Sequence, residues 1–135
     1  MKQSSGIIVK CQNKVLLCKR AKINEPNKWA IPMGGIEPNE NTKDAAYREF
    51  SEEMGVSIQE DIKYIGFINR YNKNGEFKSR LHLYSYDTNV KLIPDLENAS
   101  HGFEHSECGY FSKQEISEMN ISDSLKEAVL KSLSD

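Results

Sequence analysis

A chain of 135 residues is most simply one compact domain, and its hydrophobic content of 38% is that of an ordinary soluble protein. Its formal net charge of -2 argues against a protein that coats duplex DNA or RNA, and no apolar run approaches the roughly 20 residues that a membrane span requires. The first apolar burst is too short for a secretory signal, so we expect one domain over residues 1–135, located in the cytoplasm.

The first predicted element is a β-hairpin over residues 6–20, GIIVKCQNKVLLCKR. Two runs rich in β-branched residues and leucine flank Gln12-Asn13, a pair typical of a tight turn. Positive charge is concentrated in this region, because residues 1–33 contain seven basic side chains and one acidic one. Residues 95–135 contain nine acidic and three basic side chains, so only the first part of the chain is suited to face phosphate.

The next segment, WAIPMGGIEPNE over residues 29–40, is expected to be a loop. It combines an aromatic residue, prolines and the adjacent glycines Gly34 and Gly35. Glycines allow a backbone to approach a ligand closely, so this loop is a candidate for ligand contact.

A helix of about three turns is predicted from Thr42 to Met54. Either Asn41 or Thr42 can cap its start, and Gly55 ends it. At about 100° per residue, one arc of this helix is apolar and is expected to be buried. That arc consists of Ala46, Tyr47, Phe50 and Met54.

A second arc of the same helix carries three carboxylates, Glu49, Glu52 and Glu53. Their mutual repulsion costs a few tenths of a kcal/mol per pair in solvent, and more in a cleft, where a divalent cation would remove it. Taken alone, such a cluster is more often a solvated surface than a metal site. The glycine-containing segment before the helix, and Arg48 beside Glu49, favour a metal site, because Arg48 could hold the carboxylates in position.

Two further elements follow the helix. Residues 62–88 predict a second hairpin joined at Asn74-Gly75, with His82, Tyr84 and Tyr86 on one face of its second strand. Near the C-terminus, Ser112 and Glu115 form a capping box. A last helix, SDSLKEAVLKSLSD, is expected to bury one face, formed by Leu125, Ala128, Val129 and Leu133. Strands on both sides of a central helix predict an α/β domain with a mixed sheet covered by helices.

The three cysteines, Cys11, Cys18 and Cys108, are an odd number without a CxxC pair. This pattern supports neither a disulfide framework nor a structural zinc site. We therefore expect three ordinary thiols in a reducing compartment.

The segment from Gly34 to Val56 resembles the Nudix box, the signature of the Nudix hydrolase superfamily, with no specified position missing. The matching residues are Gly34, Glu40, Arg48, Glu49, Phe50, Glu52, Glu53, Gly55 and Val56. The resemblance implies a Nudix-type α/β/α sandwich, with residues 1–135 as a single Nudix domain. It also implies hydrolysis of a phosphoanhydride bond in a nucleoside diphosphate derivative, with Mg²⁺ or Mn²⁺ as cofactor.

The resemblance also assigns roles to residues. Glu52, Glu53 and the Gly34 carbonyl would bind metal, while Glu49 would bind metal or activate the attacking water. Arg48 and Glu40 would orient these groups. Hard carboxylate oxygens suit a hard cation that bridges phosphates.

Two further residues are expected to contact the substrate. They are Gly35, beside the metal site, and Arg20, at the end of a predicted strand. Arg20 resembles the family's phosphate contact, although a solvated charge at a strand end explains it equally well.

Residues 103–111, FEHSECGYF, resemble a segment in which a glutamate supplies a further metal ligand or the general base. We favour Glu104, because the following His105 fits a Glu-His pair seen in dinucleoside polyphosphate hydrolases. Glu107 remains the alternative. Tyr110 stands where tryptophan is common.

The resemblance implies a small nucleotide as substrate, and particular residues narrow this expectation further. Residues 32–36, PMGGI, are similar to those of dinucleoside polyphosphate hydrolases and of bacterial RNA 5'-pyrophosphohydrolases. Tyr71 matches a downstream tyrosine of the first group, although local packing explains it equally well. Five rings could stack on a base: Trp29, Tyr71, His82, Tyr84 and Tyr110.

A dinucleoside polyphosphate is therefore the expected substrate. An RNA 5' end is an alternative and needs a basic path, which four side chains could form: Arg70, Lys73, Lys78 and Arg80. Nucleoside triphosphates and nucleotide sugars are further alternatives. A catalytically silent nucleotide-sensing domain is the alternative of another class, and the complete box favours an enzyme over it. No membrane partner and no duplex nucleic acid partner is expected.

Overall fold

The computed structural model describes residues 2–21, 27–99 and 105–133, which form a seven-stranded sheet and its flanking helices. The strands are β1 (Gln3–Cys11), β2 (Lys14–Arg20), β3 (Trp29–Ala30), β4 (Met33–Gly35), β5 (Lys63–Tyr71), β6 (Phe77–Thr88) and β7 (His105–Phe111). The helices are α1 (Thr42–Met54), α2 (Lys113–Ser117) and α3 (Asp123–Ser132), with a 3₁₀ turn at η1 (Leu96–Asn98).

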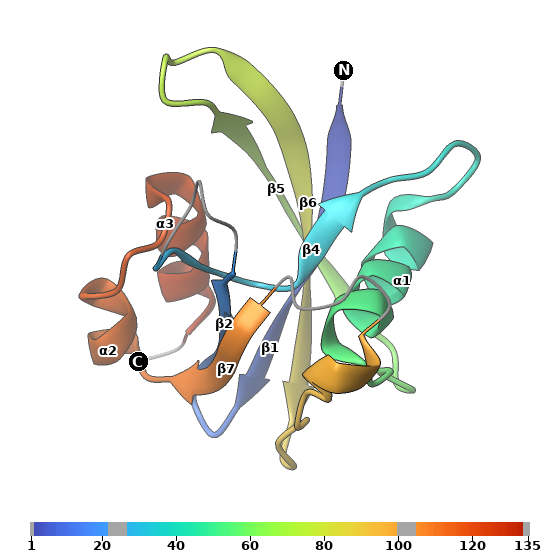
Figure 1. Ribbon diagram of the computed structural model, residues 1–135, viewed down its shortest axis with the longest axis vertical. Helices are drawn as coiled ribbons and strands as arrows, with labels where there is room; N and C mark the ends of the chain where they lie inside the picture. The colour runs from blue at the N-terminus through green and yellow to red at the C-terminus, as the bar shows by residue number, and fades with distance from the viewer. Residues whose placement is uncertain (1, 22–26, 100–104, 134–135) are drawn as a thin grey trace.

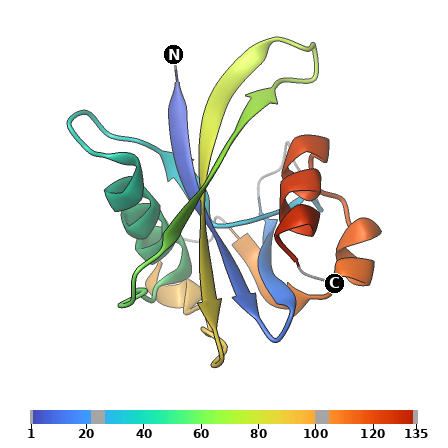
Figure 2. The ribbon, with the colours of Figure 1, turned by 180° about the vertical axis from the view of Figure 1, so that it is seen from behind.

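The sheet is mixed. Its main path runs β3-β2-β1-β6-β5, while β4 pairs with β1 and β7 pairs with β2. β1 and β6 are parallel, and the other pairings are antiparallel. Helix α1 covers one face of the sheet and α2 and α3 cover the other (Figures 1 and 2). The predicted α/β/α sandwich with a mixed sheet is therefore confirmed.

Two apolar clusters hold these layers together. On the α1 side, Phe50 and Met54 pack against Ile7 and Val9 of β1. On the other side, Leu125 and Val129 of α3 belong to the same cluster as Ile8 of β1. Successive residues of β1 thus point to opposite faces, as the pleat of a strand requires.

The local signals for turns and caps agree with the structure. Gln12 and Asn13 have φ values of 53° and 61°, as a tight hairpin turn needs. Helix α1 spans Thr42–Met54 as predicted, and Asn41 rather than Thr42 is its cap. Gly55 ends it with φ of 69°. The capping box of Ser112 and Glu115 is present at the start of α2.

The expected loop over residues 29–40 is wrong in part, because two short strands form there. β3 pairs with β2, and β4 pairs with β1 through Gly34 opposite Ser5 and Gly35 opposite Ser4. Gly34 and Gly35 thus belong to a strand ladder, whose hydrogen bonds with β1 fix their position.

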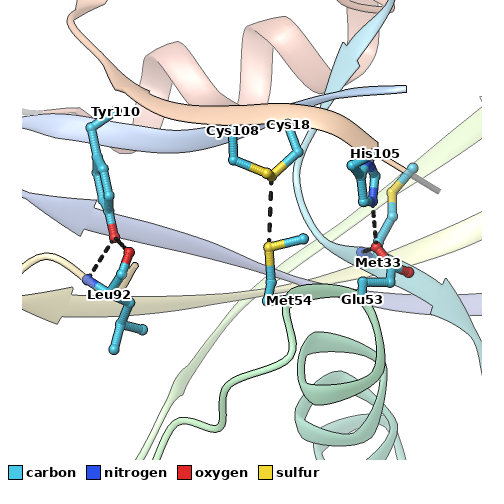
Figure 3. The surroundings of a disulfide bond; sticks show 8 residues. All are labelled: Cys18, Met33, Glu53, Met54, Leu92, His105, Cys108 and Tyr110. Carbon is cyan, nitrogen blue, oxygen red and sulfur yellow. Dashed lines mark hydrogen bonds and ion pairs between the residues drawn. A yellow bond between two sulfur atoms is a disulfide. The ribbon is translucent and has the colours of Figure 1, made fainter. Parts of the chain in front are cut away.

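The expectation of three ordinary thiols is wrong for two of the cysteines. Cys18 of β2 and Cys108 of β7 lie directly opposite each other and form a disulfide, while Cys11 is free and buried. The Cys18 sulfur lies 3.6 Å from the Met54 sulfur at the end of α1 (Figure 3). Since disulfides are uncommon in the reducing cytoplasm, the cytoplasmic location stays a prediction. In the described ranges, no helix is long and apolar enough to cross a bilayer.

Candidate active site

Strand β4 brings the paired glycines against the carboxylates of α1. A Cβ atom at Gly34 would overlap the Glu49 carboxylate, so any other residue here would displace that carboxylate. The backbone of Gly34 and the side chain of Glu49 therefore share one small space. This close approach is the physical reason for a glycine here.

Arg48 joins four carboxylates and a carbonyl through one guanidinium group. It donates to Glu40 through Nε at 2.8 Å and through Nη2 at 3.0 Å, so this pair is bidentate. Its Nη1 lies 2.8 Å from Glu49 and 2.9 Å from Glu52, and its Nη2 donates to the Gly35 carbonyl at 2.8 Å. Glu37 completes the group at 3.0 Å from Nε. The expected orienting role of Arg48 and Glu40 thus has a direct geometric basis.

Glu53 is held differently from the other two glutamates of the helix. Its side chain is 6% exposed, compared with 13% for Glu49 and 22% for Glu52. One Glu53 oxygen lies 3.0 Å from His105 Nε2 and 3.3 Å from the Met33 backbone nitrogen (Figure 3). Glu53 is therefore anchored to β4 and β7, while Glu52 stays with Arg48.

The contact between His105 and Glu53 was not predicted from the sequence. It is 4% exposed at the start of β7, and its ring nitrogen reaches a carboxylate 52 positions earlier in the chain. The sequence offered only the adjacent Glu104 as a signal. Strand pairing between β2 and β7 places the imidazole beside Glu53.

The electrostatics of these carboxylates differ. Burial raises the pKa of Glu49 to about 7, the hydrogen bond from Arg48 opposes this shift, and the charge of Glu53 adds to it. In contrast, the hydrogen bond from Arg48 holds the pKa of Glu40 below its ordinary value. The same hydrogen bonds raise the pKa of Arg48, so it stays cationic. Burial and the neighbouring Glu53 charge thus disfavour the ionised form of Glu49, while Arg48 favours it.

A cavity of about 300 Å³ opens beside these carboxylates. Among the residues that line it are five of the predicted site residues: Arg20, Gly34, Gly35, Glu49 and Glu53. Glu52 and Arg48 are not among its described lining residues, and Arg48 Nη1 joins Glu52 to Glu49. A larger cavity of about 490 Å³ lies between β5 and α3, away from the carboxylates.

Tyr71 lies outside this cavity but close to it. A neighbouring cleft of about 360 Å³ is lined by Tyr71, Lys28 and Lys73, and it shares Arg70 and Lys78 with the first cavity. The Tyr71 residue is 59% exposed. Its ring is therefore accessible beside a basic surface.

The other four candidate stacking rings have structural contacts. Trp29 packs edge-on against Phe111 with centroids 5.1 Å apart. The Tyr84 hydroxyl bonds Thr42 at 2.6 Å, and the Tyr110 hydroxyl bonds the Leu92 backbone. His82 bonds Tyr64 and Gln3 on the face of the sheet that α1 covers. Tyr71 is the candidate best placed to meet a base.

The basic path proposed for RNA is partly present. Arg70, Lys73 and Lys78 line the two connected spaces. Arg80 does not join them, because its guanidinium lies 4.1 Å from the centre of the Phe67 ring and donates to Asn69. Alternation along β6 turns Arg80 to the opposite face from Ser79.

Glu104 lies outside the described residues. Glu107 is exposed on β7 opposite Lys19 of β2 and is not part of the described cavity lining. The sequence therefore remains the basis for preferring Glu104.

The residues present fit a hard divalent cation. Glu49, Glu53 and the Gly34 backbone converge on one space and offer oxygen ligands, and the raised pKa of Glu49 reflects its burial, with a smaller contribution from the charge of Glu53. Among the described residues, no three His, Cys, Asp or Glu side chains form a closed metal-binding group. Mg²⁺ is commonly bound through one or two carboxylates together with waters and substrate phosphates.

We expect the stability of the metal-free protein to fall as pH rises from about 4.5 to about 7. In this window the folded protein retains the Glu49 proton that the unfolded chain has lost, so the unfolded state is increasingly favoured. Added Mg²⁺ replaces this proton, and its stabilising effect should be larger at about pH 8 than at about pH 6. Thermal melts with and without Mg²⁺ at the two pH values measure this pH dependence of the Mg²⁺ stabilisation. Glu49→Gln should abolish the pH dependence. Equal Mg²⁺ effects at both pH values would contradict the assignment.

Comparison with known proteins gives one consistent family. Residues 1–131 match the model of the NUDIX domain. The chain is 39% identical over 64 residues to an RNA pyrophosphohydrolase of Pelagibacter ubique, a match that covers 47% of this chain and 40% of that protein. It is 38% identical over 58 residues to Nudix hydrolase 25 of Arabidopsis thaliana, covering 43% and 32% respectively. These matches therefore span less than half of either relative.

A solved structure agrees over almost the whole chain. The MutT NUDIX hydrolase of Burkholderia pseudomallei superposes with a TM-score of 0.80 over 98% of both chains, at 19% sequence identity. At this identity the likeness establishes the fold.

Proposed function

The chain belongs to the NUDIX domain family, and from this premise we propose that it is a Nudix pyrophosphohydrolase that cleaves a phosphoanhydride bond in a nucleoside diphosphate derivative. The observation that carries the proposal is the convergence of Glu49, Glu53 and Gly34 on one wall of a cavity that Arg20 also lines. The cavity thus combines carboxylates that could bind a metal ion with an arginine that could bind phosphate groups.

In this proposal the side chains have distinct tasks. Glu52, Glu53 and the Gly34 carbonyl would hold Mg²⁺ or Mn²⁺, and the ion would neutralise phosphate charge and lower the pKa of the attacking water. Glu49 would hold the ion or accept the proton of that water, and a pKa of about 7 suits a general base near neutral pH. Arg48 would keep Glu49 and Glu52 in place.

A dinucleoside polyphosphate is the substrate that we propose. Such a molecule needs a metal-lined site for the bond that is cleaved, positive charge along the phosphates and a surface for the second nucleoside. The cavity supplies the first two, and the adjoining cleft supplies exposed Tyr71. An RNA 5' end is the second candidate, favoured by Lys28 and Lys73 in the same cleft and by the name of the Pelagibacter ubique relative.

We expect a dinucleoside polyphosphate to be turned over at least about tenfold faster, in kcat/KM, than a plain nucleoside triphosphate, since base stacking contributes about 1–3 kcal/mol. Tyr71→Ala should narrow this gap by raising KM for the larger substrate. Steady-state assays of both substrates measure the effect. Phe77→Ala is the matched control, because Phe77 is another exposed ring beside Tyr71, with centroids 6.1 Å apart.

A preference for plain triphosphates, or an equal loss on both substrates in Tyr71→Ala, would exclude the dinucleotide assignment. Release of diphosphate from triphosphorylated RNA at a higher kcat/KM would favour the RNA candidate. Absence of turnover across the whole panel with Mg²⁺ would favour a nucleotide-sensing domain.

Glu104 is proposed as the additional metal ligand or general base. If so, Glu104→Gln should lower kcat far more than it raises KM, whereas Glu107→Gln should have little effect. The exposed position of Glu107 makes it a suitable matched control. Steady-state rates of the two variants decide between them, and the reverse ranking would show that Glu107 has the role.

A further inference from the structure

Strand β7 contains an irregularity that decides where the side chain of His105 points. Cys108 of β7 lies directly opposite Cys18 of β2. Two positions further along β2, Arg20 lies opposite His105, which is three positions away from Cys108. The exposed Ser106 is therefore an extra residue in β7, with no counterpart on β2. Such a bulge bends a strand and re-aims the side chains beyond it.

The bulge turns His105 toward helix α1. Cys108 and Tyr110 of β7 pack against the apolar cluster on the α1 side of the sheet. Strict alternation would place Ser106 on this side as well, and His105 on the opposite side. Because Ser106 is the extra residue, His105 takes its place and faces α1. Figure 3 shows the side chains of Tyr110, Cys108 and His105 pointing from β7 to the same side.

The contact that results fixes one oxygen of Glu53. His105 Nε2 lies 3.0 Å from Glu53 Oε1, and the Met33 backbone N–H donates to the same oxygen at 3.3 Å. An ionised carboxylate only accepts hydrogen bonds, so Nε2 carries the hydrogen of this contact. The two side chains are 4% and 6% exposed, so water cannot readily replace the imidazole as donor. Donors from β4 and β7 thus give the Glu53 carboxylate a defined orientation at the cavity that it lines.

We propose that His105 is a positioning residue for the metal site. By donating to Oε1, it sets the orientation in which the Glu53 carboxylate meets a divalent cation, and it thereby sets the affinity for that cation. The inference rests on the proposed function and deepens it, because it names a residue outside α1 and β4 on which metal binding depends. Removal of a hydrogen-bond partner of a metal ligand typically lowers metal affinity about 10-fold to 100-fold.

The test measures binding of Mn²⁺ to the whole chain without nucleotide, from the electron paramagnetic resonance signal of the free ion. His105→Ala should weaken Mn²⁺ binding about tenfold or more. His105→Gln should stay within about threefold of the wild type, because the glutamine amide can donate to the same oxygen. His82→Ala is the matched control, since His82 bonds Tyr64 and Gln3 and is not among the described residues that line the cavity. Its Mn²⁺ affinity should equal that of the wild type.

Kinetics and thermal melts provide two further readouts. His105→Ala should raise the Mg²⁺ concentration that gives half of the maximal rate about tenfold, and His105→Gln should restore most of this loss. All titrations are made well below the melting temperature of each variant. A lower melting temperature of His105→Ala with unchanged Mn²⁺ affinity would indicate a structural role and overturn the proposal. Mn²⁺ affinity as weak in His105→Gln as in His105→Ala, or wild-type protein that does not bind Mn²⁺, would also overturn it.

These outcomes are separate from the fate of the proposed function. Mn²⁺ binding that depends on His105, without metal-dependent hydrolysis of any nucleotide, would refute the enzyme and retain the positioning role. Metal-dependent hydrolysis with equal Mn²⁺ affinity in the wild type and His105→Ala would refute the positioning role alone.

Discussion

Replacing Glu53 with glutamine should lower kcat/KM about 100-fold to 1000-fold, a loss of about 3–4 kcal/mol of transition-state stabilisation. The change removes one negative charge from the wall that would hold the cation. Because Glu53 is 6% exposed, water cannot readily replace the lost ligand. Activity within about threefold of wild type at saturating Mg²⁺ would remove Glu53 from the metal site.

The fold should survive this substitution. The amide of glutamine retains an oxygen that can accept from His105 and from the Met33 backbone, as a Glu53 oxygen does now. Circular dichroism melts check this point. Glu118→Gln is the control, since it removes the same charge from an exposed position at the end of α2.

Replacing Arg48 with alanine should be nearly as damaging and should act on stability as well as on rate. Removal of the guanidinium leaves Glu40, Glu49 and Glu52 with side chains only 13–22% exposed and without their shared cation. We expect a loss of about 2 kcal/mol or more in the free energy of unfolding, and a fall in kcat/KM of at least about 100-fold. Denaturant unfolding and steady-state rates measure the two effects.

Two comparisons make this prediction specific. Arg48→Lys should recover only part of the loss, because an ammonium cannot make the bidentate contact with Glu40 and also reach the Gly35 carbonyl. Lys43→Ala, on the same helix, removes an exposed ion pair with Asp61 and should change stability by at most about 0.5 kcal/mol. Equal stability of Arg48→Ala and Lys43→Ala would show that the Arg48 network is dispensable.

Local signals in the sequence predicted most of the fold. Helix α1 was predicted from its cap, its apolar arc and Gly55, and both hairpins were predicted from alternation and turn residues. The short strands β3 and β4 were missed because their two or three residues gain their order from pairing with β2 and β1. Such pairing joins strands that are distant in the sequence, so a local sequence pattern does not predict it.

The candidate site likewise combines residues that a local pattern predicted with contacts that depend on distant segments. Spacing along α1 identified Arg48 and the three glutamates, because one helix carries all of them. The burial of Glu53, its contact with His105 and the disulfide between Cys18 and Cys108 all depend on the packing of β7 beside β2. Contacts between elements that are distant in the chain were therefore the part of the site that sequence patterns did not predict.

The most direct test of the account is the Mg²⁺-dependence of hydrolysis of two adenosines joined by four phosphates, followed by separation of the nucleotide products. The wild type should convert this substrate to shorter adenine nucleotides with Mg²⁺ and should lose this activity when the metal is chelated. Glu53→Gln should show almost no conversion under either condition. Conversion that persists without divalent metal, or that proceeds equally in Glu53→Gln, would contradict the account.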